Sequence, residues 1–197
     1  SIQKSKHSSR LEHYADRELP SVTVAIPARN ETEDLEVCIR SLLANDYPKL
    51  EILVLDDCSQ DKTSDIIKKF AHDGVRFIKG SAPDPKWLPK NHAYQRLLDE
   101  ASGAYILFCG VDTRFGSHAI HALVEYAVSD RKDMVSVLPK RLTNNTAAAF
   151  IQPMRYWWEL SIPRWLTKRP PVLSTCWLIR KERLLNQGGF KAVARTI

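Results

Sequence analysis

The architecture of this chain follows from two similar stretches, VTVAIPARNE at residues 22–31 and EILVLDDCSQDKT at residues 51–63. Each begins with a short run of β-branched and apolar residues and continues into polar residues typical of turns. The first run predicts a strand over residues 22–26, which Pro27 is expected to end, and the second predicts a strand over residues 51–55. Apolar residues at helical spacing follow each run, so each stretch is expected to lead from a strand into a helix.

The rest of the chain continues this alternation. Further strands are predicted at residues 75–78, 104–109, 134–138 and 172–179. One helix is predicted to start near residues 31–34 and to end at Tyr47-Pro48, and a second is predicted to follow residues 61–63 and to include Phe70. Two more are predicted over residues 91–101 and from a Ser117 cap to about residue 128. Gly188, Gly189 and Phe190 predict a tight loop. Strands that alternate with helices give an α/β fold with a mostly parallel central sheet flanked by helices.

Composition excludes several classes of protein, and the net charge indicates the kind of partner. Of the 197 residues, 44% are hydrophobic and 26% are charged, which excludes a disordered chain, a collagen-like repeat and a coiled coil. The formal net charge of +6 suits an anionic partner such as a nucleotide, a phospholipid surface or nucleic acid. The four cysteines lack the spacing of a zinc site, and no run of residues predicts a signal peptide or a membrane span. A reducing compartment is therefore expected.

Charged side chains follow three of the predicted strands at the point where each strand ends. Arg29 and Glu31 follow the first strand, Asp56 and Asp57 follow the second, and Asp112 follows the apolar run at 104–109. Ligands of open α/β sheets bind outside the carboxyl ends of the strands, so these groups are expected to converge on a binding site.

The paired aspartates allow two interpretations. Successive residues of a strand point to opposite faces, so one carboxylate of Asp56 and Asp57 can hold the following loop while the other faces a ligand. Alternatively, the segment from Asp56 to Thr63 forms turns and a helix start, without a ligand.

The sequence around Asp112 and around Lys90 indicates a function less specifically than the paired aspartates do. Asp112 could hold a divalent cation on a diphosphate, or could simply stabilise a turn. Lys90 precedes a predicted helix, where it could meet phosphate, or it could be an ordinary solvated lysine.

An aromatic and basic stretch spans residues 150–169 and includes Trp157, Trp158 and Trp165. It could pack as a core layer, bind nucleic acid or lie at a membrane interface, where amphipathic rings and cations are both favourable.

Taken in order, these segments resemble the inverting family-2 nucleotide-sugar glycosyltransferases, whose GT-A fold has a Rossmann-like, mostly parallel sheet. The resemblance covers about residues 20–195 and rests on residues 24–31, 41–43, 46–48, 53–63, 90, 103–105, 112–115 and 188–190. The segments also resemble membrane-associated branches that glycosylate lipids, including hopene-associated and ceramide-glucosyltransferase-like enzymes. This resemblance implies a membrane-associated protein, and the aromatic and basic stretch at 150–169 predicts association with the cytoplasmic face of the membrane.

The resemblance implies transfer of a sugar from a nucleotide-diphosphate donor, here a UDP-sugar, to a hydroxyl of a lipid or membrane-proximal acceptor. Asp57 would accept the imide N–H of uracil, and Asp112 would contact a Mn²⁺ or Mg²⁺ ion as the last residue of the family's Asp-x-Asp motif. The residues implied to bind the nucleotide sugar are Pro27, Ala28, Arg29, Glu31, Asp57, Lys90 and Asp112.

The sequence departs from the family pattern at two places. Gly110 stands where the family has the first aspartate of Asp-x-Asp, and the stretch after Phe190 carries no carboxylate before Ile197. The catalytic base is therefore expected beyond Ile197. On this resemblance the chain divides into a polar extension at 1–20, a nucleotide-sugar-binding half at 21–140 and an acceptor- and membrane-proximal half at 141–197, which looks truncated.

Three other functions compete with this interpretation. A nucleotide-sugar-binding domain without turnover would fit Gly110 and the missing base. A phosphorelay receiver domain also uses paired aspartates, but there they follow the first strand rather than the second. A nucleic-acid binder would need clustered basic residues, whereas here they are spread along the chain, so nucleic acid is not an expected partner.

Overall fold

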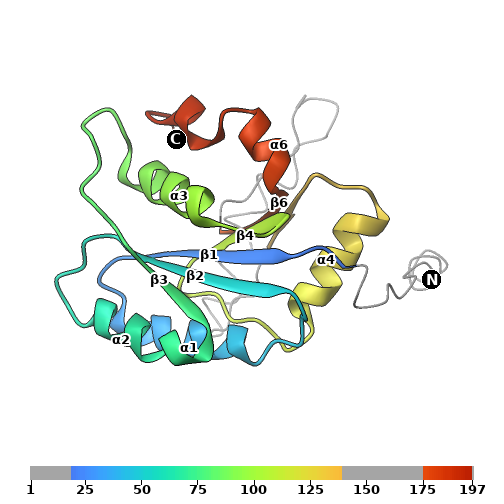
Figure 1. The fold of residues 1–197 in the computed structure, drawn as a ribbon, viewed down its shortest axis with the longest axis horizontal. Helices are drawn as coiled ribbons and strands as arrows, with labels where there is room; N and C mark the ends of the chain where they lie inside the picture. The colour runs from blue at the N-terminus through green and yellow to red at the C-terminus, as the bar shows by residue number, and fades with distance from the viewer. Residues whose placement is uncertain (1–18, 139–174, 197) are drawn as a thin grey trace, which may run out of the picture.

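The computed structural model describes residues 19–138 and 175–196, and it confirms the α/β class with a mostly parallel sheet (Figure 1). The sheet has the order β3-β2-β1-β4-β6-β5, in which β1 to β4 are parallel and β6 runs antiparallel to both β4 and β5. In chain order the elements are β1 (Val22–Ala28), α1 (Thr32–Leu43), β2 (Leu50–Asp56), α2 (Thr63–Lys69), η1 (Ala71–Asp73), β3 (Val75–Lys79), α3 (Pro89–Glu100), β4 (Tyr105–Cys109), α4 (Ala119–Ser129), β5 (Met134–Val137), β6 (Cys176–Arg180), α6 (Lys181–Asn186) and η2 (Gly189–Val193).

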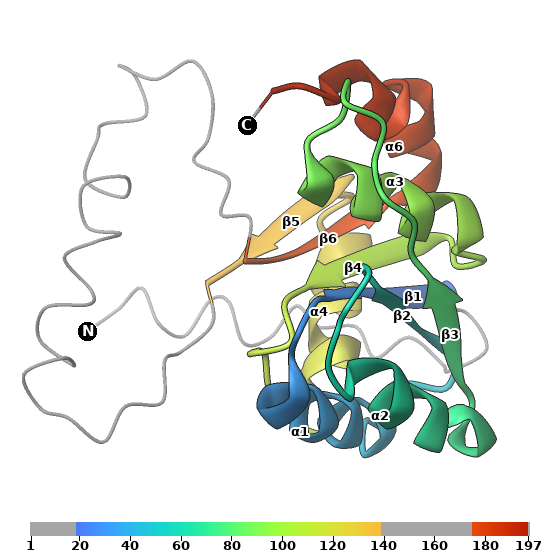
Figure 2. The ribbon, with the colours of Figure 1, turned by 90° about the vertical axis from the view of Figure 1, so that its left-hand side faces the viewer.

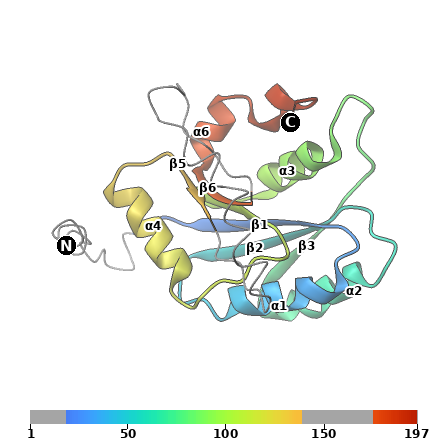
Figure 3. The same ribbon diagram turned by 180° about the vertical axis from the view of Figure 1, so that it is seen from behind.

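The helices form a layer on each face of the sheet. Helices α1 and α2 lie on one face and α3 and α6 on the other, as the edge-on view in Figure 2 and the rear view in Figure 3 both show. Buried residues of α4 pack in the same cluster as those of α1 and α2, which places α4 on that first face. The result is three layers with two apolar interfaces.

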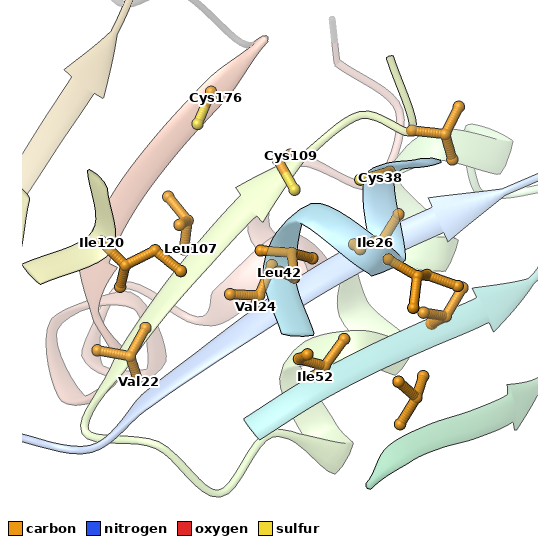
Figure 4. Packing of buried hydrophobic residues seen from close by; sticks show 14 of the residues in the cluster. Val22, Val24, Ile26, Cys38, Leu42, Ile52, Leu107, Cys109, Ile120 and Cys176 are labelled. Carbon is orange, nitrogen blue, oxygen red and sulfur yellow. The ribbon is translucent and has the colours of Figure 1, made fainter. Parts of the chain in front are cut away.

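Alternation along the strands builds these two interfaces. Val22, Val24 and Ile26 of β1 face the α1 side, and Figure 4 shows them beside Leu42 and Leu107. Ala25, between them in the sequence, belongs to the cluster on the α3 side. All five residues of β4 are buried, because this central strand has both faces covered by helices. The apolar run at 104–109 therefore becomes the middle of the sheet.

Pro27 does not end the first strand, so that expectation was wrong. Strand β1 continues to Ala28, and Pro27 is in register with Leu55 of β2. Pairing with β4 on the other side stops at Ala25. The carbonyl of Ala28 accepts a hydrogen bond from the Asp57 N–H on the β2 side, so by alternation the Pro27 nitrogen faces the side without a partner strand.

Several other boundaries also differ from the sequence predictions. The Ser117 cap was wrong, because α4 begins at Ala119 with His118 as the N-cap residue and no side-chain cap. Helix α3 begins two residues early, with Pro89 in its first turn, where the missing N–H costs nothing. The last strand is Cys176–Arg180 rather than 172–179, and residues 172–174 lie outside the described ranges.

Hydrogen bonds to the Glu51 carboxylate connect several segments at the amino end of the sheet. The carboxylate accepts hydrogen bonds from Thr23 Oγ1 at 2.5 Å, from the Ser102 N–H at 2.9 Å and from Arg76 at 2.6 Å. Gly103 lies so close to Thr23 that a Cβ atom there would be 2.5 Å from the Thr23 nitrogen. The approach of these two segments therefore requires glycine at position 103.

Several predictions fall on residues that the structure does not describe. They are the extension at 1–20, apart from Leu19 and Pro20, and the aromatic and basic stretch at 150–169. Strand β6 comes from the predicted acceptor half and lies in the same sheet as the first half, and the division of the chain into halves stays a prediction. Within the described ranges, no helix has the length and apolar character needed to cross a membrane.

Candidate nucleotide-sugar site

The loops after β1 and β2 are joined by hydrogen bonds at the carboxyl end of the sheet. Asn30, which has a positive φ of 54°, accepts a hydrogen bond from the Gln60 N–H at 2.9 Å. The Asn30 N–H donates to Ser59 Oγ at 3.0 Å, and the Glu31 N–H donates to Thr63 Oγ1 at 2.9 Å. These contacts fix Arg29 and Glu31 relative to the aspartates that follow β2.

The adjacent aspartates have different surroundings. Asp56 holds the loop, since its carboxylate accepts hydrogen bonds from the Ser59 N–H at 3.0 Å and from the Ser64 hydroxyl. Burial opposes ionisation of Asp56, but these hydrogen bonds outweigh it and hold its pKa below the usual range. Asp57 is also buried and lines a cavity. Both interpretations of the pair therefore describe part of the structure: a turn at Asp56 and a cavity wall at Asp57.

Asp112 lies on the loop that leaves β4, and Arg114 fixes that loop. The Arg114 guanidinium donates to the Val111 carbonyl at 2.7 Å and pairs with Asp34 of α1. The Thr113 N–H donates to the Gly110 carbonyl at 3.1 Å, which closes a tight turn around Asp112. The Asp112 side chain is exposed and lines the same cavity as Asp57.

The first turn of α3 forms the opposite wall. Lys90 is exposed, with its ammonium 5.5 Å from the centre of the Tyr94 ring. Tyr94 is buried against Phe108 and Phe190, and its burial raises its pKa to about 12, so its hydroxyl stays protonated. The helix start also presents backbone N–H groups without intrahelical partners, which favours an anion nearby.

All seven residues that the sequence assigned to the nucleotide sugar line one cavity of about 410 Å³. Their convergence agrees with the expectation that ligands bind at the carboxyl edge of the sheet. The function of each residue stays a prediction. The lining consists of those seven together with five that the sequence analysis did not assign, Pro89, Ala93, Tyr94, Gly110 and Thr175.

Helical spacing could have identified some of the cavity-lining residues that the sequence analysis did not assign. Pro89, Ala93 and Tyr94 stand beside Lys90 on α3, so a helix that begins at Pro89 puts them on the cavity side together. Thr175 precedes β6 and reaches the cavity because β6 pairs with β4. No local pattern in the sequence indicates that pairing.

The electrostatics of the cavity favour a cation near Glu31. Burial and the negative charges of Asp34, Asp112 and Asp61 raise the pKa of Glu31 above its usual range. A carboxylate in that position gains free energy when a positive charge arrives.

The Gly-Gly-Phe loop packs against α3 from the other side. Gly188 and Gly189 have positive φ angles of 86° and 61°, so the predicted tight loop is confirmed. The Phe190 N–H donates to Gln95 Oε1 at 2.9 Å, and the phenyl ring joins the aromatic cluster under the cavity. Further along, the Ala194 carbonyl accepts from the Leu88 N–H at 2.8 Å, so this segment supports the start of α3.

Residues 23–185 match the family described as Glycosyl transferase family 2. The chain belongs to this family. The resemblance drawn from the ordered motifs is therefore confirmed, and the six-stranded sheet with its helices is the GT-A fold of this family.

Curated relatives of this family-2 chain carry glycosyltransferase names. The probable glycosyltransferase YdaM of Bacillus subtilis is 28% identical over 190 residues, covering 90% of this chain and 45% of the relative. The 4,4'-diaponeurosporenoate glycosyltransferase of Staphylococcus aureus is 27% identical over 132 residues, covering 66% of this chain and 34% of the relative. The chain thus spans less than half the length of either protein.

Two solved structures share the fold. The mannosyltransferase PcManGT from Pyrobaculum calidifontis, in complex with GDP-Man and Mn²⁺, superposes with a TM-score of 0.67 at 21% identity, covering 88% of this chain and 48% of that one. Residues 1–349 of S. aureus TarS, in complex with UDP-GlcNAc, superpose with a TM-score of 0.61 at 19% identity, covering 85% of this chain and 47% of that fragment. At these identities the likeness supports the fold alone.

Proposed function

We propose that this chain is the donor-binding part of an inverting glycosyltransferase that takes a sugar from a nucleoside diphosphate, with UDP as the expected nucleotide. The observation that carries the proposal is the convergence of three carboxylates and two cationic side chains on one cavity at the carboxyl end of the sheet. Family membership supports the reaction class, and a volume of about 410 Å³ lies within the usual range for small-molecule sites.

The lining residues suit the parts of such a donor. The Asp57 side chain offers carboxyl oxygens on a buried wall, so it can accept a hydrogen bond from the imide N–H of uracil. Lys90 and the N-terminus of α3 offer positive charge and N–H groups to the diphosphate. Because Arg114 holds the turn around Asp112, the Asp112 carboxylate is positioned before the donor arrives.

The carboxylates of the cavity also suit a divalent cation, as the family implies. Magnesium and manganese prefer oxygen ligands, and magnesium often uses one or two carboxylates together with substrate phosphates. Asp112 would be the protein ligand, with Glu31 adding negative charge nearby. When bound, such an ion supplies Lewis-acid stabilisation of the charge on the leaving diphosphate.

For the acceptor we propose a hydroxyl of a lipid or of a molecule at the membrane surface on the cytoplasmic face. One relative is named for 4,4'-diaponeurosporenoate, a lipid-like acceptor, which supports this choice. The stretch at 150–169, with its tryptophans and basic residues, has the composition of a membrane-interface segment.

A second candidate is a nucleotide-sugar-binding domain without turnover. Gly110 favours it, because this position contributes no carboxylate to the cavity. Sugar transfer by a longer form of the protein that extends beyond Ile197 would exclude it.

Calorimetric binding of UDP and GDP, with and without Mn²⁺, tests the proposal. We expect Mn²⁺-dependent binding that Asp112→Asn weakens. The matched control is Asp65→Asn, which neutralises an exposed carboxylate on α2 outside the cavity. If neither nucleotide binds under any condition, the proposed function is wrong.

A further inference from the structure

A second group of titratable side chains lies at the other end of the sheet, where α1 leads into β2. Asp46 lies in that loop, and His118 and His121 stand at the start of α4. One ligand atom from each of the three side chains lies within 4.8 Å of the others. Nδ1 of His118 is 2.9 Å from Oδ2 of Asp46, and the two imidazole rings stack with their centres 4.6 Å apart.

The backbone brings these residues together independently of their side chains. The Asp46 N–H donates to the Ser117 carbonyl at 2.9 Å, and Asn45 Nδ2 donates to the Gly116 carbonyl at 2.9 Å. Asp46 is therefore held next to His118 even though 72 residues separate them in the sequence. Such a preformed arrangement lowers the entropy cost of binding an ion.

His121 is the buried member of the group, with 7% of its surface exposed to solvent. Its Nε2 atom lies 3.4 Å from Oε1 of Glu125, one turn further along α4, and makes no hydrogen bond within the described ranges. The edge of the ring is packed against Tyr47. Metal-bound histidines usually have a carboxylate or carbonyl behind the ring, which fixes its tautomer and orientation.

We propose that Asp46, His118 and His121 bind a divalent transition-metal ion such as Zn²⁺, with Glu125 as the carboxylate partner of the His121 ring. Two imidazoles and one carboxylate form a ligand set that suits zinc, whereas magnesium and calcium prefer oxygen ligands alone. Water completes the coordination. The ion joins the loop between α1 and β2 to α4, and it is separate from the cation proposed at Asp112.

Zinc titration tests this proposal in the absence of nucleotide. The exposed thiol of Cys58 can also bind zinc, so every variant carries Cys58→Ser. We expect one Zn²⁺ to bind per chain, and both Asp46→Asn and His118→Gln to weaken binding by at least about tenfold. Zinc should also raise the melting temperature of the parent chain but not that of these two variants.

The design separates zinc binding from folding and from the nucleotide site. Asp46 and His118 are exposed, so their variants should fold, and melting without metal verifies this. His72→Gln removes an exposed histidine outside the group and should keep parental zinc affinity, as should Asp112→Asn. If Asp46→Asn and His118→Gln bind zinc as tightly as His72→Gln, or if the parent binds none, the site does not exist and Asp46–His118 is a surface ion pair.

Discussion

Two carboxylates at opposite ends of the sheet, Glu51 and Glu31, have opposite surroundings. At the amino end, Glu51 is half-buried, and its hydrogen bonds from Thr23, Ser102 and Arg76 outweigh the effect of burial and lower its pKa. At the carboxyl end, burial and neighbouring negative charges raise the pKa of Glu31. A carboxylate satisfied by the protein contributes to stability, whereas one surrounded by like charges costs stability and is available to a ligand.

The same contrast occurs between two adjacent residues. Asp56 is saturated by loop hydrogen bonds, and Asp57 lines the cavity. Asp56 is the last residue of β2, whereas Asp57 is the first residue of the loop that follows. The distinction between stability and binding therefore changes within a single peptide unit, and substitutions at either end of the sheet test it.

The largest loss of stability is expected at the amino end, for Gly103→Ala. The new Cβ would overlap the backbone of Thr23, so we expect the free energy of unfolding to fall by about 1–3 kcal/mol. Denaturant unfolding measures this loss. Gly116→Ala is the control, since no atom lies within 4 Å of a Cβ at that position, and an equal loss in both variants would contradict the account.

A smaller effect with a defined pH dependence is expected for Glu51→Gln. Because the folded protein lowers the pKa of Glu51, the ionised group stabilises the fold above its unfolded pKa, and this contribution is lost as the pH falls through the folded pKa. We expect the variant to be about 1 kcal/mol less stable at pH 7 and the difference to vanish in acid. A difference that does not shrink as the pH falls through the acid range would contradict this explanation.

The smallest expected change in stability is an increase, for Glu31→Gln at the carboxyl end of the sheet. The raised pKa of Glu31 means that its ionised form opposes folding at neutral pH, so Glu31→Gln should slightly raise the melting temperature. It should also weaken Mn²⁺-dependent nucleotide binding. Glu33→Gln, at an exposed carboxylate in the first turn of α1, is the control for both measurements. A lower melting temperature for Glu31→Gln would show that its carboxylate is structural.

The sequence predicted features that depend on local pattern. Alternation and helical spacing gave the α/β class, and the rule that ligands bind at the carboxyl ends of strands correctly predicted that Asp57 and Asp112 line one cavity. The unforeseen features depend on distant pairing. Pro27 continues β1 because β4 has already ended beside it, and Thr175 reaches the cavity through the pairing of β6 with β4. The residues adjacent to Pro27 and Thr175 in the sequence do not indicate either feature.

One paired experiment tests directly whether Asp56 serves stability and Asp57 serves binding. Asp56→Asn and Asp57→Asn are each compared with the parent chain by thermal unfolding and by calorimetric titration with UDP and Mn²⁺. We predict that Asp56→Asn melts at a lower temperature but, while folded, keeps its affinity for UDP. Asp57→Asn should melt like the parent and bind UDP about ten- to a hundredfold more weakly, the range of a lost hydrogen bond to a charged group. Equal affinity for UDP in both variants would contradict the account.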